Sequence, residues 1–364
     1  MNIAVLGAGN GGYACSADLT LRGFKVNLYE SPEFEETIKP VIERGGIDIS
    51  GAAGTGFAKL NKATTDIREA LENTDLVIVV TPAFAHEFLA KKCAPYLRDQ
   101  PVILNPGHTG GALNFAKNLK EGGFGRRIKV GETMVLTYVC RKTAPGQIKI
   151  FHVMKQLLFG AFPSQYTDEL YGAFKDLYPA IVAGANVLDS GLTNLAAMFH
   201  PPGMLLNAGW IEFTNGAFKF YFEGITKSVA RVVEALDQER LRIMDRLGLE
   251  PVPFTEWYYR QGCTPVRANS VYEALQAGGP DQNLKAPDSL NHRYVIEEIN
   301  HGLVPIASIG HMFDVATPNI DALIRVGSTT NQIDFWKEGL TAEKMGIAGL
   351  SLAKLKKFLE EGYS

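Results

Sequence analysis

The sequence has few of the residues that mark disulfide-rich or metal-binding proteins. Only four of its 364 residues are cysteines, and no two of them form a Cys-x-x-Cys pair: Cys15, Cys93, Cys140 and Cys263. No group of histidines has the spacing of metal ligands. We therefore expect free thiols in the reducing cytoplasm, with no disulfide and no metal site.

Charge of one sign and long apolar runs are also lacking. The formal net charge is −3, without a basic tail or a block of like charges, so nothing favours nucleic acid as a partner. Gly, Pro or charged residues interrupt every apolar run well before the ~18 residues that a membrane span needs. Met1 leads directly into the first apolar run, which leaves no room for a signal peptide. These absences predict a cytoplasmic protein without a membrane partner, and they leave the oligomeric state open, a homodimer included.

The N-terminus, by contrast, carries a glycine loop that is typical of dinucleotide binding. A short apolar strand ends at Leu6, and a Gly-x-Gly-x-x-Gly turn follows it before a helix-like run from Cys15. In such turns the first glycine permits a tight turn, the second lets the backbone approach the pyrophosphate, and the third lets the helix pack on the strand. The helix N-terminus then offers free N–H groups to the pyrophosphate. We expect cofactor contacts from Gly7, Ala8, Gly9, Asn10, Gly11 and Gly12.

A second predicted strand, Lys25 to Tyr29, ends at Glu30. An acidic residue about 20 positions after the glycine loop binds the ribose hydroxyls of NAD and repels the 2′-phosphate of NADP. Glu30 therefore predicts NAD, used as NADH, rather than NADP. The alternative is an ordinary solvated glutamate at the end of a strand.

Two further runs, Asp75 to Val80 and Val102 to Asn105, are apolar enough to be strands buried on both faces of a parallel sheet. Ligands bind beyond the C-terminal ends of such strands, so the loops that follow are expected on the side of the glycine loop. A histidine in such a loop is nevertheless more often a surface or helix-capping residue. The candidates in these loops are Thr81 and Pro82 for the cofactor, and His86 and His108 for cofactor or substrate.

The remaining pattern divides the chain into two domains. Further strands are expected over residues 45–60, 133–139, 147–153 and 180–187, and helices over 66–72 and 166–177. From Leu192 onward helical spacing takes over, and apolar residues from Ile225 to Leu247 form one stripe of a long amphipathic helix. Shorter helices are expected over 268–276, 290–300, 319–326 and 350–360. We predict an α/β fold with a Rossmann-type doubly wound parallel sheet over residues 1–187, followed by an all-helical domain over residues 188–364.

The helical half contains two stretches whose residues suit catalysis. In the first, His200 precedes Pro201 and Pro202. A residue before proline is disfavoured in a helix, so His200 is expected to end one helix and to project from the break before the next. The alternative is a helix-terminal histidine that bonds to a carbonyl group.

The second stretch runs from Arg293 to Glu298. In one continuous helix Arg293 and Glu297 share a face, and so do Tyr294 and Glu298. The alternative is an ordinary ion pair on a helix surface, which contributes only ~0.3–0.5 kcal/mol.

Four segments together resemble the opine dehydrogenase family: Gly-Ala-Gly-Asn-Gly-Gly, His-Pro-Pro-Gly, Arg-Tyr-x-x-Glu followed by an acid, and Gly-Leu-Val-Pro. The family includes octopine and nopaline dehydrogenases and bacterial N-(carboxyethyl)amino-acid dehydrogenases, and the resemblance covers nearly the whole chain in order and spacing. It implies that His200 is the catalytic histidine, Arg293 a substrate-binding arginine and Glu298 the acid paired with the histidine. The family usually has Asp at this last position. The longer Glu298 and its neighbour Glu297 leave open which carboxylate reaches His200, although the motif favours Glu298.

The resemblance implies an NADH-dependent enzyme that condenses an amino acid with a 2-oxo acid such as pyruvate. The resulting imine is reduced to an N-(carboxyalkyl)amino acid, and the reaction also runs in reverse. A histidine that titrates near neutrality suits the proton transfers, and a nearby carboxylate is expected to raise its pKa. Arg293 offers a planar fork to a substrate carboxylate, and Arg141, expected just past the strand 133–139, is a weaker candidate for such a contact.

Two other functions remain open. One is a reductase of a plain ketone, as in the ketopantoate and glycerol-3-phosphate dehydrogenase families, which use a lysine at the start of the helical domain. No lysine lies between Lys175 and Lys219, which argues against them. The other is a non-catalytic NAD-binding sensor. The sequence does not identify the amino acid or the 2-oxo acid.

Overall fold

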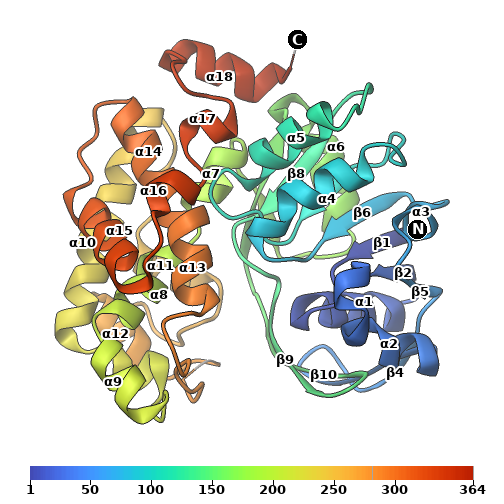
Figure 1. Ribbon diagram of the computed structural model, residues 1–364, viewed down its shortest axis with the longest axis horizontal. Coiled ribbons are helices and arrows are strands. Elements are labelled where there is room, and N and C mark those ends of the chain that lie inside the picture. The colour runs from blue at the N-terminus through green and yellow to red at the C-terminus, as the bar shows by residue number, and fades with distance from the viewer. Residues whose placement is uncertain (281, 364) are drawn as a thin grey trace. The chain divides into compact units, whose positions relative to one another are not determined.

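The chain forms two compact units, shown in Figure 1. The computed structural model describes residues 1–280 and 282–363. The α/β unit comprises Met1–Gly107, Gly111–Val187 and Phe358–Ser364, and the helical unit comprises His108–Gly110 and Leu188–Lys357. The units are therefore not the two continuous segments that the sequence predicts, because two short segments belong to the other unit.

Side-chain and backbone contacts explain both exchanges. The ring of Phe358 packs on Phe162 with 5.1 Å between centroids, which ties the C-terminal segment to the α/β unit. Thr109 donates from its backbone N–H to the carbonyl of His301 (3.1 Å) and from its hydroxyl to the carbonyl of Gly191 (2.8 Å). These bonds tie the loop after the fifth parallel strand to the helical unit. Neither contact belongs to a periodic pattern, so neither is visible in the sequence.

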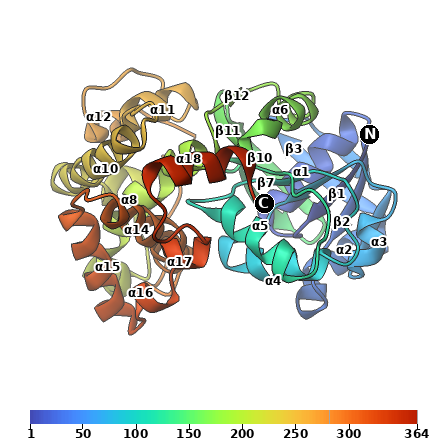
Figure 2. The ribbon, with the colours of Figure 1, turned by 90° about the horizontal axis from the view of Figure 1, so that it is seen from above.

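The main sheet of the α/β unit is of the doubly wound, Rossmann type, as predicted. Its strands are β1 (Asn2–Leu6), β2 (Lys25–Tyr29), β5 (Lys62–Thr64), β6 (Leu76–Val79), β7 (Val102–Leu104), β8 (Val130–Thr133), β11 (Leu157–Phe162) and β12 (Ile181–Ala183). They lie in the order β12-β11-β8-β7-β6-β1-β2-β5, and the strands from β5 to β8 are parallel. Every residue of β6 is buried, as expected for a strand covered on both faces. In Figure 2, α4 (His86–Cys93) and α5 (Gly111–Glu121) lie on one face, and α6 (Thr167–Lys175) lies on the other.

A smaller sheet contains, in order, β4 (Gly56–Lys59), β3 (Gly46–Gly51), β10 (Gln147–Val153) and β9 (Tyr138–Ala144). The helix α1 (Asn10–Leu21) contacts strands of both sheets. The strand expected over residues 133–139 is wrong, because β8 ends at Thr133 and β9 begins at Tyr138. The side-chain oxygen of Asn105 accepts hydrogen bonds from Thr133 and Thr137 and holds the chain in a connection between the sheets. Arg141 therefore lies within β9 rather than past a strand.

Shorter helices complete both units. The last expected strand, 180–187, is also too long, since β12 ends at Ala183 and the next helix begins at Val187. The remaining helices are α2 (Glu35–Arg44), α3 (Ile67–Leu71), α7 (Val187–Leu192), α8 (Ala196–Leu205), α9 (Ala208–Thr214), α10 (Lys227–Leu247), α11 (Phe254–Arg260), α12 (Val271–Gln276), α13 (Arg293–Glu298), α14 (Val304–Met312), α15 (Pro318–Asn331), α16 (Phe335–Glu338), α17 (Ala342–Met345) and α18 (Leu352–Glu361).

The longest helix of the helical unit, α10, confirms the predicted amphipathic stripe except for Ile225, which precedes the start of the helix at Lys227. The hydroxyl of Thr226 accepts from the backbone N–H of Val229 at its start, and Gly248, with φ +76°, ends it. Apolar side chains from Val229 to Leu247 are buried along one side. None of the helices within the described residues has the length and apolar character of a membrane span.

The helix that carries His200 does not end where the sequence predicts. α8 continues through Pro201 and Pro202, although prolines lack the N–H that would bond to the carbonyl one turn earlier. Every residue from Ala197 to Leu205 is buried. Tertiary packing thus outweighs the local preference against helix, and His200 lies inside a helix rather than at a break.

Candidate active site and cofactor site

The glycine loop between β1 and α1 leaves no space for a side chain at Gly7 or Gly12, but it leaves space at Gly9. Gly7 has φ +107°, and a Cβ added to it would lie 2.5 Å from the carbonyl oxygen of Val80. A Cβ on Gly12 would lie 1.7 Å from the carbonyl oxygen of Gly7, so only glycine lets the helix approach the strand this closely. A Cβ on Gly9 would meet nothing within 4 Å. The open side at Gly9 is where the spacing predicts that a pyrophosphate lies.

The helix α1 starts at Asn10, earlier than the expected Cys15, because the close packing of Gly12 holds the glycines in the first turn. No side chain of the described residues caps this N-terminus. The N–H groups of the first turn are therefore available to an anion, as a dinucleotide site requires.

Glu30, directly after β2, holds the loop from the other side. Its Oε2 accepts from the backbone N–H of Ala8 (2.7 Å), and its Oε1 accepts from that of Ser31 (2.9 Å). Oε2 also accepts from the hydroxyl of Thr37 (3.5 Å), and Oε1 can still accept another hydrogen bond, for example from a ribose hydroxyl. Beside Gly7, the buried hydroxyl of Thr81 has no hydrogen-bond partner among the described residues, and Pro82 follows it. These residues fit a bound dinucleotide.

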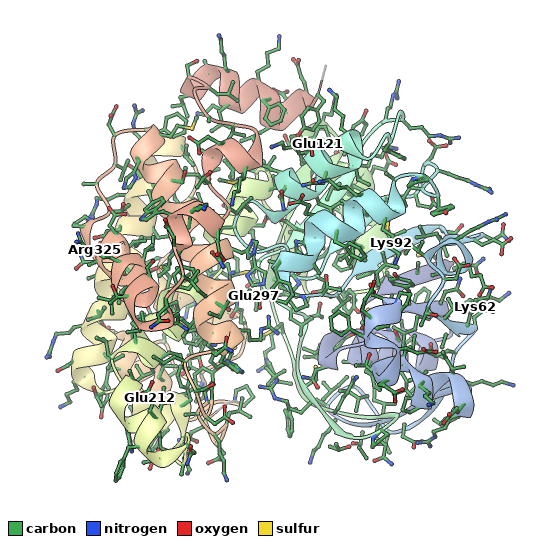
Figure 3. All side chains as sticks on the ribbon, in the orientation of Figure 1. Lys62, Lys92, Glu121, Glu212, Glu297 and Arg325 are labelled. Atoms are coloured by element: carbon green, nitrogen blue, oxygen red, sulfur yellow. The ribbon has the colours of Figure 1, made fainter. Side chains whose placement is uncertain are left out.

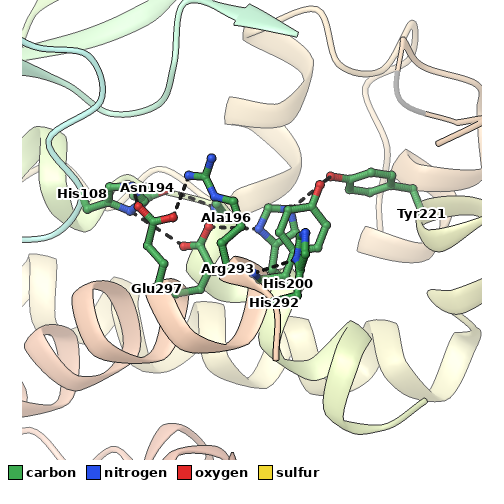
Figure 4. Close-up of polar contacts among 10 residues, drawn as sticks. His108, Asn194, Ala196, His200, Tyr221, His292, Arg293 and Glu297 are labelled. Carbon is green, nitrogen blue, oxygen red and sulfur yellow. Dashed lines mark hydrogen bonds and ion pairs between the residues drawn. The ribbon is translucent and has the colours of Figure 1, made fainter. Parts of the chain in front are cut away.

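In the helical unit, His200 of α8 forms a buried pair with Glu298, the last residue of α13 (Figure 4). Nδ1 of His200 lies 3.1 Å from Oε1 of Glu298, and Nε2 lies 3.0 Å from the hydroxyl of Tyr221. The ring of Tyr294 stacks on the imidazole with 3.7 Å between centroids and an interplanar angle of 8°. The imidazole is therefore held by a bond at each nitrogen and by a ring on its face.

A second histidine–carboxylate pair lies beside the first. Nε2 of His108 is 3.1 Å from Oε1 of Glu297, and its Nδ1 is 3.1 Å from the side-chain nitrogen of Asn194 (Figure 4). The other oxygen of Glu297 lies 2.7 Å from a guanidinium nitrogen of Arg293, which is half-exposed. Glu297, a residue of α13, is labelled in Figure 3. The buried carboxylate of Glu297 thus lies between the imidazole of His108 and the guanidinium of Arg293.

The pKa values of the two histidines shift in opposite directions. Burial lowers the pKa of His200, and the opposing effect of Glu298 does not cancel it, so the pKa lies below the ordinary value. This corrects the expectation that the paired carboxylate raises the pKa. Burial acts in the same sense on His108, but Glu297 and Glu298 together outweigh it, and the pKa of His108 is raised. The surroundings of His200 therefore favour its neutral form, and those of the neighbouring His108 favour the protonated form.

The other expected candidates, Arg141 and His86, belong to the α/β unit. Arg141 is exposed on β9, where it donates to the carbonyl of the adjacent Cys140 (3.1 Å). His86, the first residue of α4, is fully buried and meets the ring of Phe115 edge-on at 6.4 Å between centroids, so it packs α4 against α5. All four cysteines are free and buried. Within the described residues, no group of three or more His, Cys, Asp or Glu side chains is arranged to hold a metal ion.

The sequence does not predict that Tyr221 and Asn194 belong to this cluster. Tyr221 lies in an aromatic segment with no recognisable motif, and no sequence pattern marks it. Asn194 begins the stretch that contains His200, but only the fold of the loop that carries His108 brings the two together. His108 itself was one of several strand-end candidates, and nothing in the sequence linked it to Glu297.

Each of the two units matches a family model of known dehydrogenases over most of its length. Residues 2–130 match the family model of the N-terminus of NAD-dependent glycerol-3-phosphate dehydrogenase. Residues 183–331 match that of the alpha-helical domain of NAD/NADP octopine/nopaline dehydrogenase. A solved structure of octopine dehydrogenase with NADH and L-arginine superposes with a TM-score of 0.79 and 18% identity, over 100% of this chain and 99% of that one, which shows a shared fold.

Similarity in sequence extends along the whole chain. The protein "ocs" of Agrobacterium tumefaciens (strain Ach5) is 25% identical, over 96% of this chain and 95% of its own length. An opine dehydrogenase of Arthrobacter sp. (strain 1C) is 36% identical over 98% of both chains. With that identity over almost its full length, the chain belongs to the opine dehydrogenase family.

Proposed function

We propose that His200 and Glu298 are the acid–base pair of an NADH-dependent reductive condensation. The substrates are a 2-oxo acid, such as pyruvate, and the amino group of an amino acid. They form an imine whose reduction gives an N-(carboxyalkyl)amino acid, and the reaction also runs in reverse. The observation that carries the proposal is the buried His200, bonded to Glu298 through Nδ1 at 3.1 Å and neutral near pH 7 because its pKa is lowered.

The neutral imidazole suits the first steps. With Nδ1–H donating to Glu298, Nε2 is the basic nitrogen, and it takes the proton that the amine loses as it adds to the carbonyl carbon. The same nitrogen returns this proton to the oxygen of the adduct, which becomes a hydroxyl group. A second proton, taken up from solvent, then lets the hydroxyl leave as water and gives the protonated imine. Glu298 keeps the ring oriented and stabilises the imidazolium between these two transfers. The hydroxyl of Tyr221, 3.0 Å from Nε2, lies where these protons pass.

Arg293 binds the carboxylate of the 2-oxo acid in this proposal. Its guanidinium is half-exposed and keeps donors beyond the one that lies on Glu297, and a planar fork matches a carboxylate in two parallel bonds. Glu297 holds the guanidinium in place, and His108 stabilises Glu297 in turn. Arg141 is the candidate for a second carboxylate, that of the amino acid.

The α/β unit holds the cofactor. Its glycine loop, Glu30 and Thr81 bind the dinucleotide, which supplies a hydride to the imine carbon when bound. Glu30 favours NAD over NADP, because a carboxylate accepts the two ribose hydroxyls and repels a 2′-phosphate.

The test is NADH oxidation with pyruvate, screened across amino acids and compared with an amine-free control. We expect oxidation that depends on the amino acid, and its loss in His200→Ala with NADH binding intact. Oxidation with pyruvate alone would instead indicate a reductase of plain ketones. NADH binding without turnover for any pair, and no effect of His200→Ala beyond stability, would indicate a sensor.

We also propose that the enzyme works in the cytoplasm, since its four cysteines are buried free thiols. A homodimer stays a prediction, to be tested by light scattering of the purified protein. A mass of one chain at micromolar concentration would contradict it.

A further inference from the structure

Lys142 of β9 contacts the glycine loop through two different groups. Its backbone N–H donates to the side-chain oxygen of Asn10 (2.8 Å), and its ammonium donates to the carbonyl of Ala8 (2.6 Å). Asn10 is the first residue of α1, and Ala8 lies between the first two glycines. A strand of the smaller sheet therefore borders the part of the loop that surrounds a pyrophosphate.

The ammonium of Lys142 forms no salt bridge with the described residues, although the negative charge of Glu30 acts on it. It lies 3.8 Å from the ring centroid of Tyr13. The side chain is half-buried, and burial lowers the pKa of Lys142. An ammonium has three N–H donors, and the carbonyl of Ala8 takes one of them. A partly desolvated positive charge at this point suits a ligand that brings negative charge.

The neighbouring residues of β9 do not share this position. Successive side chains of a strand point to opposite faces, so Arg141 is directed away from the face of Lys142. Arg141 is exposed and bonds to the adjacent backbone. Lys149 of β10, which pairs with Arg141 in the ladder, is exposed as well. Of these three basic residues, Lys142 is the one with bonds to the glycine loop.

We propose that Lys142 is a cofactor-binding residue whose ammonium contacts the diphosphate of NAD. The ammonium complements the N–H groups at the start of α1 with a full positive charge. The backbone bond to Asn10 keeps this charge beside the loop. The inference rests on the cofactor site and not on the proposed reaction, and it deepens the assignment of the loop by adding a residue from a second sheet.

The experiment is a set of titrations with the full-length protein. NADH binding is followed by fluorescence, and binding of ADP-ribose, 2′-phospho-ADP-ribose and adenosine by calorimetry. The variants are Lys142→Met and Lys142→Arg, with Lys149→Met as the matched control for loss of a lysine on the same hairpin. Thermal melting shows whether each variant is folded, and Lys142→Gln replaces Lys142→Met if the latter does not fold. Turnover plays no part, so failure of the proposed reaction leaves the test intact.

We expect Lys142→Met to weaken NADH and ADP-ribose binding by about tenfold and adenosine binding not at all, because only the first two carry the diphosphate. Lys142→Arg should restore most of the affinity, and Lys149→Met should bind like the unchanged protein. Unchanged NADH affinity in Lys142→Met would overturn the proposal. So would an equal loss for adenosine, which would indicate collapse of the loop, or a loss confined to 2′-phospho-ADP-ribose, which would place the ammonium at the ribose phosphate.

Discussion

Replacing Glu298 by glutamine tests the acid–base pair with almost no change in shape. Glu298→Gln keeps the size of a side chain that is 2% exposed, but it removes the negative charge that faces Nδ1 of His200 at 3.1 Å. The amide also brings an N–H donor toward Nδ1. If that donor bonds to Nδ1, the ring proton moves to Nε2, and the nitrogen that should accept the proton of the amine is no longer basic.

The size of the effect follows from the burial of the pair. A hydrogen bond to a charged group contributes about 1.5–3 kcal/mol, and each 1.36 kcal/mol changes a rate tenfold. The imidazolium that forms between the two proton transfers loses this stabilisation, so kcat should fall by roughly 10- to 150-fold. Because Glu298 opposes the effect of burial on His200, the already lowered pKa of His200 should fall further. The acidic limb of the kcat/KM profile, where His200 becomes protonated, should move to lower pH.

The assay is NADH oxidation with the best substrate pair over a range of pH, for three variants. Glu298→Asp keeps the charge on a shorter chain, as the family usually has it, and should retain most of the activity. Glu297→Gln is the matched control, because it removes the adjacent buried carboxylate, whose contacts are His108 and Arg293. It should raise the KM of the 2-oxo acid and shift the acidic limb less than Glu298→Gln does, because Glu297 acts on the pKa of His200 more weakly than Glu298. The reasoning is refuted if Glu298→Gln keeps kcat and the acidic limb, or if Glu297→Gln alone shifts that limb.

Four further substitutions test three other parts of the structure. Tyr221→Phe removes the hydroxyl that bonds to Nε2 of His200. It should lower kcat about 3- to 10-fold without changing the KM of the amino acid. Steady-state kinetics at saturating substrates measures this, and an unchanged kcat would contradict it. Gly12→Ala puts a Cβ 1.7 Å from a backbone oxygen and should lower Tm by roughly 10 °C, whereas Gly9→Ala, whose Cβ meets nothing, should keep Tm and lose NADH binding. Equal melting of these two variants would mean that the loop is not packed as described. In Glu30→Gln the side-chain oxygen can still accept from the backbone N–H of Ala8, but the side chain no longer repels a 2′-phosphate. The preference for NADH over NADPH in kcat/KM should therefore fall about tenfold or more. An unchanged ratio would show that Glu30 does not contact the ribose.

The sequence patterns correctly predicted features that neighbouring residues determine. The glycine spacing gave the tight turn at Gly7 and the packing of Gly12, and the apolar run of β6 gave a strand buried on both faces. The strand expected over residues 133–139 failed for a non-local reason. Asn105 interrupts it through hydrogen bonds to Thr133 and Thr137, which lie 28 and 32 residues further along the chain.

The helix through His200 shows the same limit. Pro201 predicts a break, and the local rule is sound, but burial of the whole segment outweighs it. The pair of His200 and Glu298 spans 98 residues, so only the resemblance to a family joined them before the structure did. The sign of the pKa change was wrong because desolvation depends on what surrounds the ring, and the sequence does not display that.

The short segment from His108 to Gly110 limits how the protein can be divided or recombined. Two separate segments of the polypeptide belong to the helical unit, and the first of them has only three residues. A fragment cut at Leu188 would contain Glu297 without the imidazole of His108, so the buried carboxylate would lose that contact and keep the one with Arg293. A chimera that joins this helical unit to the nucleotide-binding half of a relative would inherit whatever residue that relative has in the same loop. Exchange of halves between relatives would thus alter the chemistry of the helical unit through a residue encoded in the other half.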